Sequence, residues 1–345
     1  MKQFQIPSFF DRTNATKIYP ISYGKLAKDG NDFAKSNGIK PGSADKKKIG
    51  LMIIDAQNTF CHPQGELFVA GAPDDNIRLA EFIYRNIESI SKTFVTMDTH
   101  YMKQIFHPFF WLDEHGNNVG DYTTITSQDL KDGKYTVNPA MVGNMPGATL
   151  TGLIKFAQHY VSELEKKGKF SLTVWPYHAM LGGTGHALSP IIEEAIRWHG
   201  FVRKTDVEFE VKGGNPLTEN YSVLSPEVLT APAKDPGQTV AIAARNTKFI
   251  EKLLDLDVLI IAGQAKSHCV AWSIQDLLDD IATKDPALAS KVYLLEDCTS
   301  PVVTPFVDFT KDANDAFARF KAAGMHIVKS TDAIDTWPDI MSKIS

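Results

Sequence analysis

The stretch Ile49-Gly50-Leu51-Met52-Ile53-Ile54-Asp55 (IGLMIID) decides the fold of this chain. Every residue before its final aspartate is apolar or glycine, and it follows a polar, turn-prone segment that ends in three lysines. A short apolar run without alternation is typical of a strand that is buried on both faces, as in a parallel sheet covered by helices. The stretch therefore predicts the first strand of a parallel α/β sheet.

Similar apolar runs recur along the chain and alternate with helical patterns. The further expected strands are 93–98 (TFVTMD), 171–176 (SLTVWP), 257–263 (DVLIIAG) and 291–297 (KVYLLED), with a weaker one at 200–204 (GFVRK). The expected helices are 75–91, 149–167, 190–199, 245–256, 269–282 and 311–323. Strand and helix in repeated alternation predict a three-layer α/β/α architecture with a six-stranded, mainly parallel sheet.

The flanks and two internal stretches do not follow this alternation. Residues 1–48 are polar and are expected to form an N-terminal extension, residues 49–334 the main domain, and residues 335–345 a C-terminal tail. Residues 101–147 and 205–237 are rich in Gly, Pro, Asn and Thr. We expect them to be two long loop insertions, and loops of this length in a compact domain usually have a function.

Composition restricts the class of partner. The 345 residues include 36 Lys plus Arg and 41 Asp plus Glu, a formal net charge of −5, which offers no general attraction for nucleic acid or an anionic membrane. Only three cysteines occur, Cys61, Cys269 and Cys298, which argues against a disulfide framework and for a reducing compartment. No secretory leader or membrane span is visible, so we expect a cytoplasmic protein without nucleic-acid or membrane partners.

Reactive side chains follow several of the expected strands. They are Asp55, Asp98, His178, Lys204 and Cys269. Ligands of open parallel sheets bind beyond the carboxyl ends of the strands, so these five groups are expected to share one rim.

Cys269 begins a helical pattern, where the helix dipole and a nearby lysine ammonium are expected to lower its thiol pKa. Free backbone N–H groups of the same turn can stabilise an oxyanion, and Asp55 can accept the thiol proton. The alternative interpretation is a small buried apolar side chain, the usual role of a lone cysteine.

Asp98-Thr99-His100 places a carboxylate and an imidazole on the same face of an extended segment. His178 can add a third ligand from the next expected strand end, which gives an Asp/His/His set suited to a divalent transition metal. Solvated loop polarity is the alternative interpretation, and His107 and His186 compete with His178 as ligands.

Together these motifs resemble the isochorismatase-like cysteine hydrolases, and within them the nicotinamidases. The resemblance covers residues 49–334 in order. The segments that carry it are 55–60 (DAQNTF), 98–100 (DTH), 175–178 (WPYH), Lys204, 219–222 (ENYS), 263–270 (GQAKSHCV), 294–301 (LLEDCTSP) and 317–334 (FARFKAAGMHIVKSTDAI).

The resemblance implies a role for individual residues. The catalytic triad is expected to be Asp55, Lys204 and Cys269, with the backbone N–H groups of Ala265 and Cys269 as the oxyanion hole. The Gln264–Ala265 peptide bond is expected to be cis. Substrate-binding residues are expected at Phe60, Gln264 and Tyr221, and zinc ligands at Asp98, His100 and His178.

The activity implied is hydrolysis of the C–N bond of a small carboxamide such as nicotinamide, through a thioester on the cysteine and with release of ammonia. A homo-oligomer is expected by the same resemblance. Two alternatives stay open: a hydrolase acting on a carbamoyl, ureido or larger amide substrate, and an inactive scaffold that binds a ligand.

Overall fold

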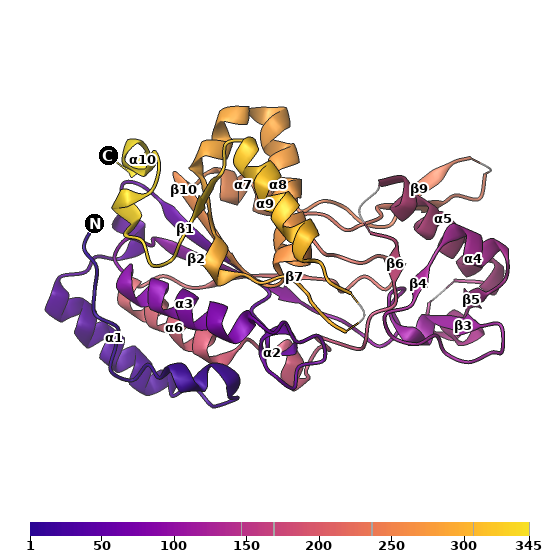
Figure 1. Ribbon diagram of the computed structural model, residues 1–345, viewed down its shortest axis with the longest axis horizontal. Coiled ribbons are helices and arrows are strands. Elements are labelled where there is room, and N and C mark those ends of the chain that lie inside the picture. The colour runs from indigo at the N-terminus through magenta and orange to yellow at the C-terminus, as the bar shows by residue number, and fades with distance from the viewer. Residues whose placement is uncertain (146, 168–169, 236, 306, 345) are drawn as a thin grey trace.

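A six-stranded sheet, parallel throughout, forms the centre of the computed structural model, which describes every residue except 146, 168, 169, 236, 306 and 345. In the order in which they lie side by side, the strands are β12(His326–Val328), β11(Val292–Leu295), β10(Val258–Gly263), β1(Ile49–Ile54), β2(Lys92–Asp98) and β7(Glu208–Lys212). The predicted six-stranded α/β architecture is confirmed, and the first stretch quoted above lies in the middle of the sheet (Figure 1).

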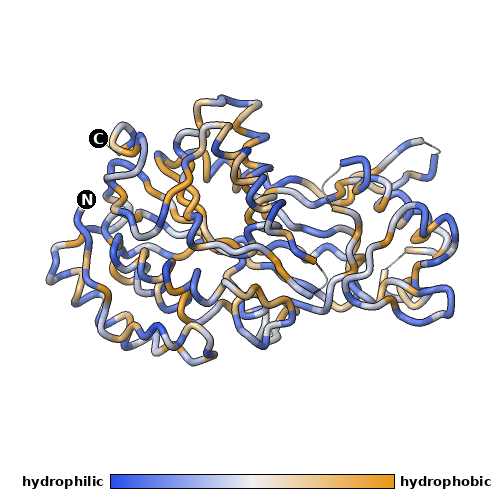
Figure 2. The backbone as a smooth tube through the Cα atoms, viewed as in Figure 1, coloured by the Kyte–Doolittle hydropathy of each residue, from blue (hydrophilic) through white to orange (hydrophobic). Residues whose placement is uncertain are grey.

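Strand β1 is buried on both of its faces. Leu51 and Ile53 pack into one hydrophobic core, whereas Met52 and Ile54 pack into a second core on the opposite side. In Figure 2 the hydrophobic colour is concentrated in the central strands, as expected for strands buried on both faces. Alternate side chains of one strand point to opposite faces, so a strand between two helical layers must be apolar at nearly every position.

Helices cover both faces of the sheet (Figure 1). One layer holds α1(Tyr23–Asn37), α3(Ala72–Arg85) and α6(Pro190–Arg203), and the other holds α7(Thr247–Leu254), α8(Ala271–Lys284) and α9(Thr310–Ala322). Two short helices, α2(Asn58–Cys61) and α10(Ile340–Ile344), lie outside these layers. Each predicted helix corresponds to an observed one, including α5(Leu150–Lys167), with shifts at the ends.

Residues 1–48 extend the first helical layer. The Phe9 ring makes edge contacts with Tyr84 of α3 and Trp198 of α6. Helix α1 lies so close to α6 that a Cβ atom on Gly30 would stand 3.1 Å from the Cβ of Phe201. The N-terminal extension therefore covers α3 and α6.

Two of the strands expected from the sequence are not part of the sheet. Residues 200–204 (GFVRK) form the end of α6, and the sheet strand is instead β7, eight residues further on. Residues 171–176 contribute only β6(Leu172–Thr173), which pairs with β4(Thr124–Ile125) in a separate two-stranded sheet. A short apolar run cannot be distinguished from the buried side of a helix by periodicity alone, which explains the first error.

The predicted loop 205–237 is wrong at residues 208–212, which form β7 of the sheet. Most of the rest of the two predicted loops folds together with α5 into a small lobe that projects from the sheet domain (Figure 1). We use the term lobe for residues 103–174 and 214–243. Its further elements are β3(Trp111–Asp113), α4(Ser127–Lys131), β5(Tyr135–Val137), β8(Thr230–Pro232) and β9(Thr239–Ala241). Phe110, Trp111 and Tyr160 are fully buried there, and they belong to the same hydrophobic core as Leu51 and Ile53 of β1.

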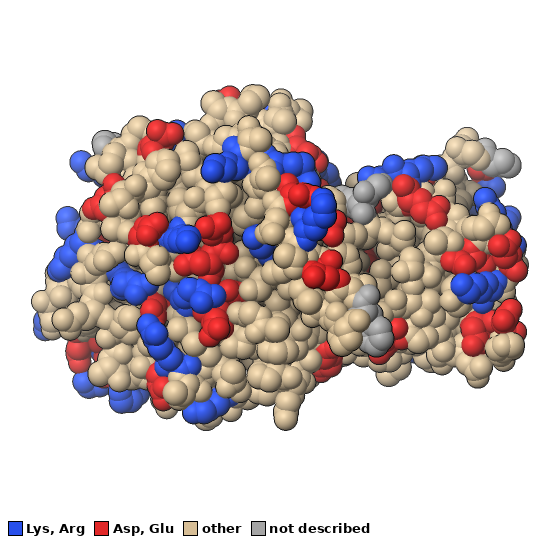
Figure 3. Space-filling view, in the orientation of Figure 1, with Lys and Arg blue, Asp and Glu red and all other residues tan. Residues whose placement is uncertain are grey.

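Charged side chains of both signs are interspersed over the face shown in Figure 3. Within the part of the chain that the structure describes, no helix has both the length and the apolar character that crossing a bilayer requires.

Candidate active site

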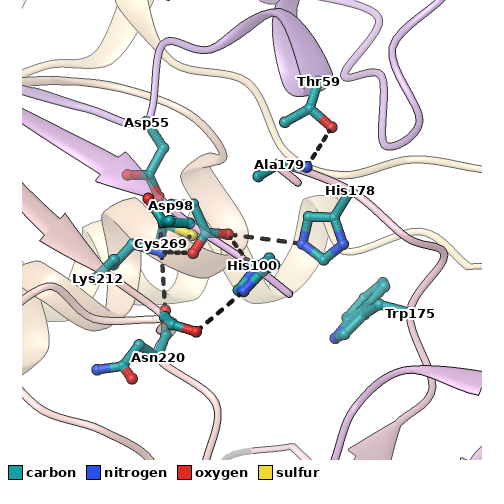
Figure 4. A network of polar contacts seen from close by, with 12 residues as sticks. Asp55, Thr59, Asp98, His100, Trp175, His178, Ala179, Lys212, Asn220 and Cys269 are labelled. Carbon is teal, nitrogen blue, oxygen red and sulfur yellow. Dashed lines mark hydrogen bonds and ion pairs between the residues drawn. The ribbon is translucent and has the colours of Figure 1, made fainter. Parts of the chain in front are cut away.

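Four of the functional side chains meet where neighbouring strands end. Asp55 directly follows β1, Asp98 is the last residue of β2, Lys212 the last of β7, and Cys269 lies in the turn between β10 and α8. The parallel register of β2 and β7 pairs Asp98 with Lys212. Figure 4 shows the four side chains converging on one point.

Lys212 is the centre of this cluster. Its Nζ lies 2.9 Å from Asp55 Oδ2, 2.9 Å from Asp98 Oδ1 and 3.5 Å from Cys269 Sγ. It also donates a hydrogen bond of 2.9 Å to the backbone carbonyl of Asn220. A buried ammonium held between two carboxylates and a thiol is an arrangement that links the charge of the sulfur to that of both acids.

The structure does not bring Lys204 to this site. It is the exposed C-terminal cap of α6, in a left-handed backbone conformation at φ 50°. The lysine of the triad expected from the sequence is therefore wrong in its position, because the segment that carries Lys204 is a helix end and not a strand end. Lys212 occupies the place that the resemblance assigns to Lys204.

Asp55 is oriented by its neighbours in the sheet. Its backbone N–H donates to Thr96 Oγ1 at 3.1 Å, and its side chain is hydrogen-bonded to the same hydroxyl. The adjacent strand can approach because Gly263 has no side chain: a Cβ there would stand 2.1 Å from the carbonyl oxygen of Ile54, and its φ is +116°. The next peptide bond, Gln264–Ala265, is cis, as the resemblance implies.

The protonation states differ from the sequence-based expectation. Burial raises the pKa of the Cys269 thiol well above its ordinary value; Lys212 opposes this, while Asp55 and Asp98 add to it. The expected lowering of the thiol pKa is thus wrong, because burial and two carboxylates outweigh one ammonium and a helix start. Burial likewise raises the pKa of Asp55 against the effect of Lys212. These directions describe a neutral thiol beside a carboxyl group that can exchange its proton.

Lys212 and Asp98 are both held in the charged form. Burial alone would lower the pKa of Lys212, but Asp55 and Asp98 raise it well above the ordinary value. Burial alone would raise the pKa of Asp98, but His100 and Lys212 hold it well below the ordinary value. This pair keeps a positive charge beside the sulfur.

Asp98, His100 and His178 form a buried donor set. Their ligand atoms lie within 4.8 Å of one another, with Asp98 Oδ2 2.9 Å from His100 Nε2 and 3.7 Å from His178 Nε2. In both imidazoles Nδ1 faces a backbone carbonyl, at 3.3 Å from Gly213 and 2.7 Å from Pro176. A carbonyl only accepts, so Nδ1 carries the proton and the Nε2 atoms turn toward Asp98. Such backbone contacts orient metal-binding histidines, and the set fits a divalent metal such as zinc.

His186 and His107, the two alternatives to His178 as metal ligands, both lie outside this donor set. His186 Nε2 is 2.8 Å from Thr99 Oγ1, and this residue is not part of the donor set. His107 lies beside the set, with its ring centroid 5.6 Å from that of His100. Its Nδ1 faces the Tyr101 carbonyl at 2.9 Å, and its Nε2 is buried with no hydrogen-bond partner among the residues that the structure describes.

A cavity opens beside Cys269. Phe60, Tyr221 and Ala265, all predicted to take part in substrate or oxyanion binding, line it together with Asp98 and His178. The Phe60 and His178 ring centroids are 5.8 Å apart. Gln264, also predicted to bind substrate, is elsewhere. Its side chain donates to Asp75 at 2.9 Å and accepts from the Ser300 N–H at 3.3 Å.

Lys212 and Glu219 have no role among the residues expected from the sequence, although Glu219 also lines the cavity. Residues 208–212 (EFEVK) alternate charged and apolar side chains before two glycines, which is a pattern of an edge strand that ends in a turn. That alternation was the available signal for Lys212.

Comparison with solved structures shows a similar fold in a protein described as a nicotinamidase/pyrazinamidase. A nicotinamidase/pyrazinamidase from Acinetobacter baumanii has a TM-score of 0.51 at 16% identity, over 83% of this chain and 98% of that chain. The yeast nicotinamidase has a TM-score of 0.49 at 19% identity, over 81% of this chain and 99% of its own. A Pyrococcus horikoshii pyrazinamidase in complex with zinc has a TM-score of 0.43 at 16% identity, over 82% and 99%.

No protein-family model matches the chain, and the comparison with curated proteins gives no match. The similarity to the Acinetobacter structure confirms, at the level of the fold, the resemblance seen in the sequence.

Proposed function

We propose that this chain is a metal-containing cysteine amidase that hydrolyses the C–N bond of a small carboxamide, with nicotinamide as the first substrate to test. The observation that carries the proposal is the buried contact of Lys212 with Cys269, Asp55 and Asp98 at the wall of a cavity. The fold shared with a protein described as a nicotinamidase/pyrazinamidase supports the choice of substrate.

In the first half of the reaction, Cys269 attacks the carbonyl carbon of the amide. Asp55, which is hydrogen-bonded to the thiol, accepts its proton as the C–S bond forms. The raised pKa of the thiol makes this base necessary, since little thiolate is present beforehand. The backbone N–H groups of Ala265 and Cys269 stabilise the tetrahedral oxyanion. The C–N bond then breaks as Asp55 gives its proton to the leaving nitrogen, which departs as ammonia and leaves the thioester on Cys269.

In the second half, the thioester is hydrolysed. A water molecule, deprotonated by Asp55, attacks the thioester carbonyl, and the C–S bond breaks to release the carboxylic acid and the thiol. Lys212 stays charged throughout because two carboxylates flank it, and it stabilises negative charge on the sulfur during both halves.

Asp98, His100 and His178 are the residues that would hold the metal. A bound zinc or similar ion supplies Lewis acidity, which attracts a basic atom of the substrate and fixes its position. Asp98 also contacts Lys212, so it would join the metal site to the nucleophile.

The test is ammonia release from nicotinamide by the metal-loaded protein and by its Cys269→Ala variant. Activity in the wild type and its loss in the variant support the proposal. A variant as active as the wild type contradicts it. Hydrolysis of ureido or larger amides but not nicotinamide would keep the mechanism and replace the substrate. No turnover of any of these compounds, with tight binding of one, would favour the ligand-binding scaffold.

A further inference from the structure

One acidic side chain in the cavity wall has no task in the mechanism above. Glu219 lies in the chain that follows β7, is only 5% exposed, and lines the same cavity as Cys269. The cavity is otherwise lined mainly by apolar and aromatic side chains. A carboxyl group in such surroundings loses hydration and needs a compensating partner.

The backbone and side chain of Glu219 are fixed in place, largely by the lobe. Its N–H donates to the Tyr160 hydroxyl of α5 at 3.1 Å, and its carbonyl accepts from the Glu227 N–H at 2.8 Å. The Tyr221 hydroxyl is hydrogen-bonded to its carboxyl group, and Trp175 Nε1 donates to that hydroxyl at 3.0 Å. The carboxyl group is therefore held at the cavity wall and is not a mobile surface group.

Among the described residues, no cation forms an ion pair with Glu219. The nearest buried ammonium, that of Lys212, already contacts Asp55 and Asp98. Burial raises the pKa of the Glu219 carboxyl well above its ordinary value, and the neighbouring Glu227 adds to this. Both facts describe an acid that gains stability when a positive charge comes near it.

Three aromatic rings stand around the same part of the cavity. Trp175 and Tyr221 are perpendicular, with an interplanar angle of 89° and centroids 6.5 Å apart. His268 has its centroid 5.6 Å from Trp175 and 5.4 Å from Tyr221. Figure 4 shows Trp175 on the far side of the metal donor set from Asp55. Aromatic rings beside a carboxylate are surroundings in which proteins bind substituted ammonium groups.

We propose that Glu219 and the rings of Trp175 and Tyr221 select a small carboxamide that carries an ammonium group. This inference rests on the proposed amidase function, because it takes the amide end of the ligand to lie at Cys269. The ammonium would donate to the Glu219 carboxylate and lie against the ring faces. Glu219 is then a specificity-determining residue and has no part in bond cleavage.

The test compares two ligands of nearly equal shape, 3-(aminomethyl)benzamide, which carries an ammonium group, and the neutral 3-ethylbenzamide. Their dissociation constants are measured by titration calorimetry on the metal-loaded Cys269→Ala protein, which cannot turn them over. We expect the ammonium ligand to bind at least about tenfold more tightly, the size of effect typical of a charge-assisted hydrogen bond.

Adding Glu219→Gln is expected to remove this preference. The matched control is Glu227→Gln, which changes a neighbouring buried carboxyl that does not line the cavity. It is expected to keep or increase the preference, because it removes a charge that raises the pKa of Glu219. If Glu219→Gln prevents folding, Tyr221→Phe replaces it, because that change removes only the hydroxyl that holds Glu219, and it should weaken the preference several-fold. Equal affinity for the two ligands, no binding of either, or a preference that survives these changes would overturn the inference.

Hydrolysis of both compounds by the wild type separates this inference from the function on which it rests. Turnover without any preference for the ammonium ligand retains the amidase and removes the role of Glu219. A preference that depends on Glu219, without turnover, retains the binding site and removes the amidase.

Discussion

The sheet edge and the lobe contribute to the same cavity in different ways. At the carboxyl ends of the sheet strands, Asp55, Asp98 and Lys212 are placed by the parallel register of β1, β2 and β7. The lobe consists of short strands and one long helix. Its β4–β6 pair ends just before Trp175, and its helix α5 supplies the Tyr160 hydroxyl that accepts from the Glu219 N–H. In the proposed function, the sheet therefore positions the reacting groups, whereas the lobe determines which ligands fit the cavity.

The largest expected effect is on kcat/KM, and it should differ strongly between substitutions of Lys212 and Lys204. Lys212→Met should reduce kcat/KM for the amide by about 10²–10³-fold, because it removes the charge that stabilises the sulfur. Lys204→Met, at an exposed helix end, should change it by no more than about twofold, as surface substitutions do. Steady-state kinetics on both variants measures the difference. Equal effects of the two changes would contradict the site described here.

The next effect concerns metal retention at the sheet edge. His100→Ala should lose bound metal in elemental analysis after dialysis, with affinity reduced by more than the roughly 10–100-fold cost of losing a supporting contact. His186→Ala is the control, because that imidazole contacts Thr99 and not the donor set. Metal retained by His100→Ala, or lost from His186→Ala, would show that the donor set is wrongly assigned.

A change within the lobe should act on substrate binding more than on chemistry. Tyr160→Phe removes the hydroxyl that accepts from the Glu219 N–H, a hydrogen bond worth about 1 kcal/mol, so KM should rise about fivefold with kcat nearly constant. Tyr135→Phe, at a partly exposed lobe position, is the control and should leave KM unchanged. A fall in kcat at constant KM would mean that the lobe affects the chemical step, and it would contradict the division of roles between sheet and lobe.

The smallest effect is on stability, away from the site. His199 in α6 is buried, its Nε2 contacts the Ile90 carbonyl at 2.9 Å, and burial lowers its pKa to about 4. Unfolded histidine titrates near 6.5, so between about pH 6.5 and 4 the unfolded chain binds a proton that the folded chain does not. The stabilising contribution is complete above about 6.5 and is lost as the pH falls toward 4.

His199→Gln should therefore make the free energy of unfolding less dependent on pH in that interval, as measured by urea unfolding at several pH values. Some dependence should remain, because burial also lowers the pKa of His107 and His268, each to about 3. An unchanged slope would mean that His199 does not titrate differently in the folded chain.

The sheet could be predicted because its central strands, such as β1, are buried on both faces and are apolar at nearly every position. Strand β7 lies at the sheet edge, with Val211 65% exposed, so its sequence alternates and does not have the apolar run that identifies the others. This physical difference led to Lys204 in place of Lys212. The strands of the lobe have only two or three residues each, too few for a recognisable pattern, so most of the lobe outside α5 was expected to form loops.

The candidate site was partly predictable for the same reason. Asp55, Asp98 and Cys269 follow strands that the sequence identifies, and they do converge. The pKa of Cys269 was not predictable, because it depends on burial and on two carboxylates from distant segments. Glu219 gains its significance only from the cavity. The expected homo-oligomer and cytoplasmic location stay predictions.

The central claim is that Cys269 is the nucleophile of an amidase, and it is tested most directly by trapping the acyl-enzyme. The protein is mixed with nicotinamide, quenched in acid within one turnover, digested and analysed by mass spectrometry. The account predicts an acyl group on the peptide that contains Cys269, and none in the Lys212→Met variant at the same time. An acyl adduct on Cys61 or Cys298 would contradict it. So would ammonia release by a wild type whose Cys269 stays unmodified, together with equal ammonia release by the Cys269→Ala variant.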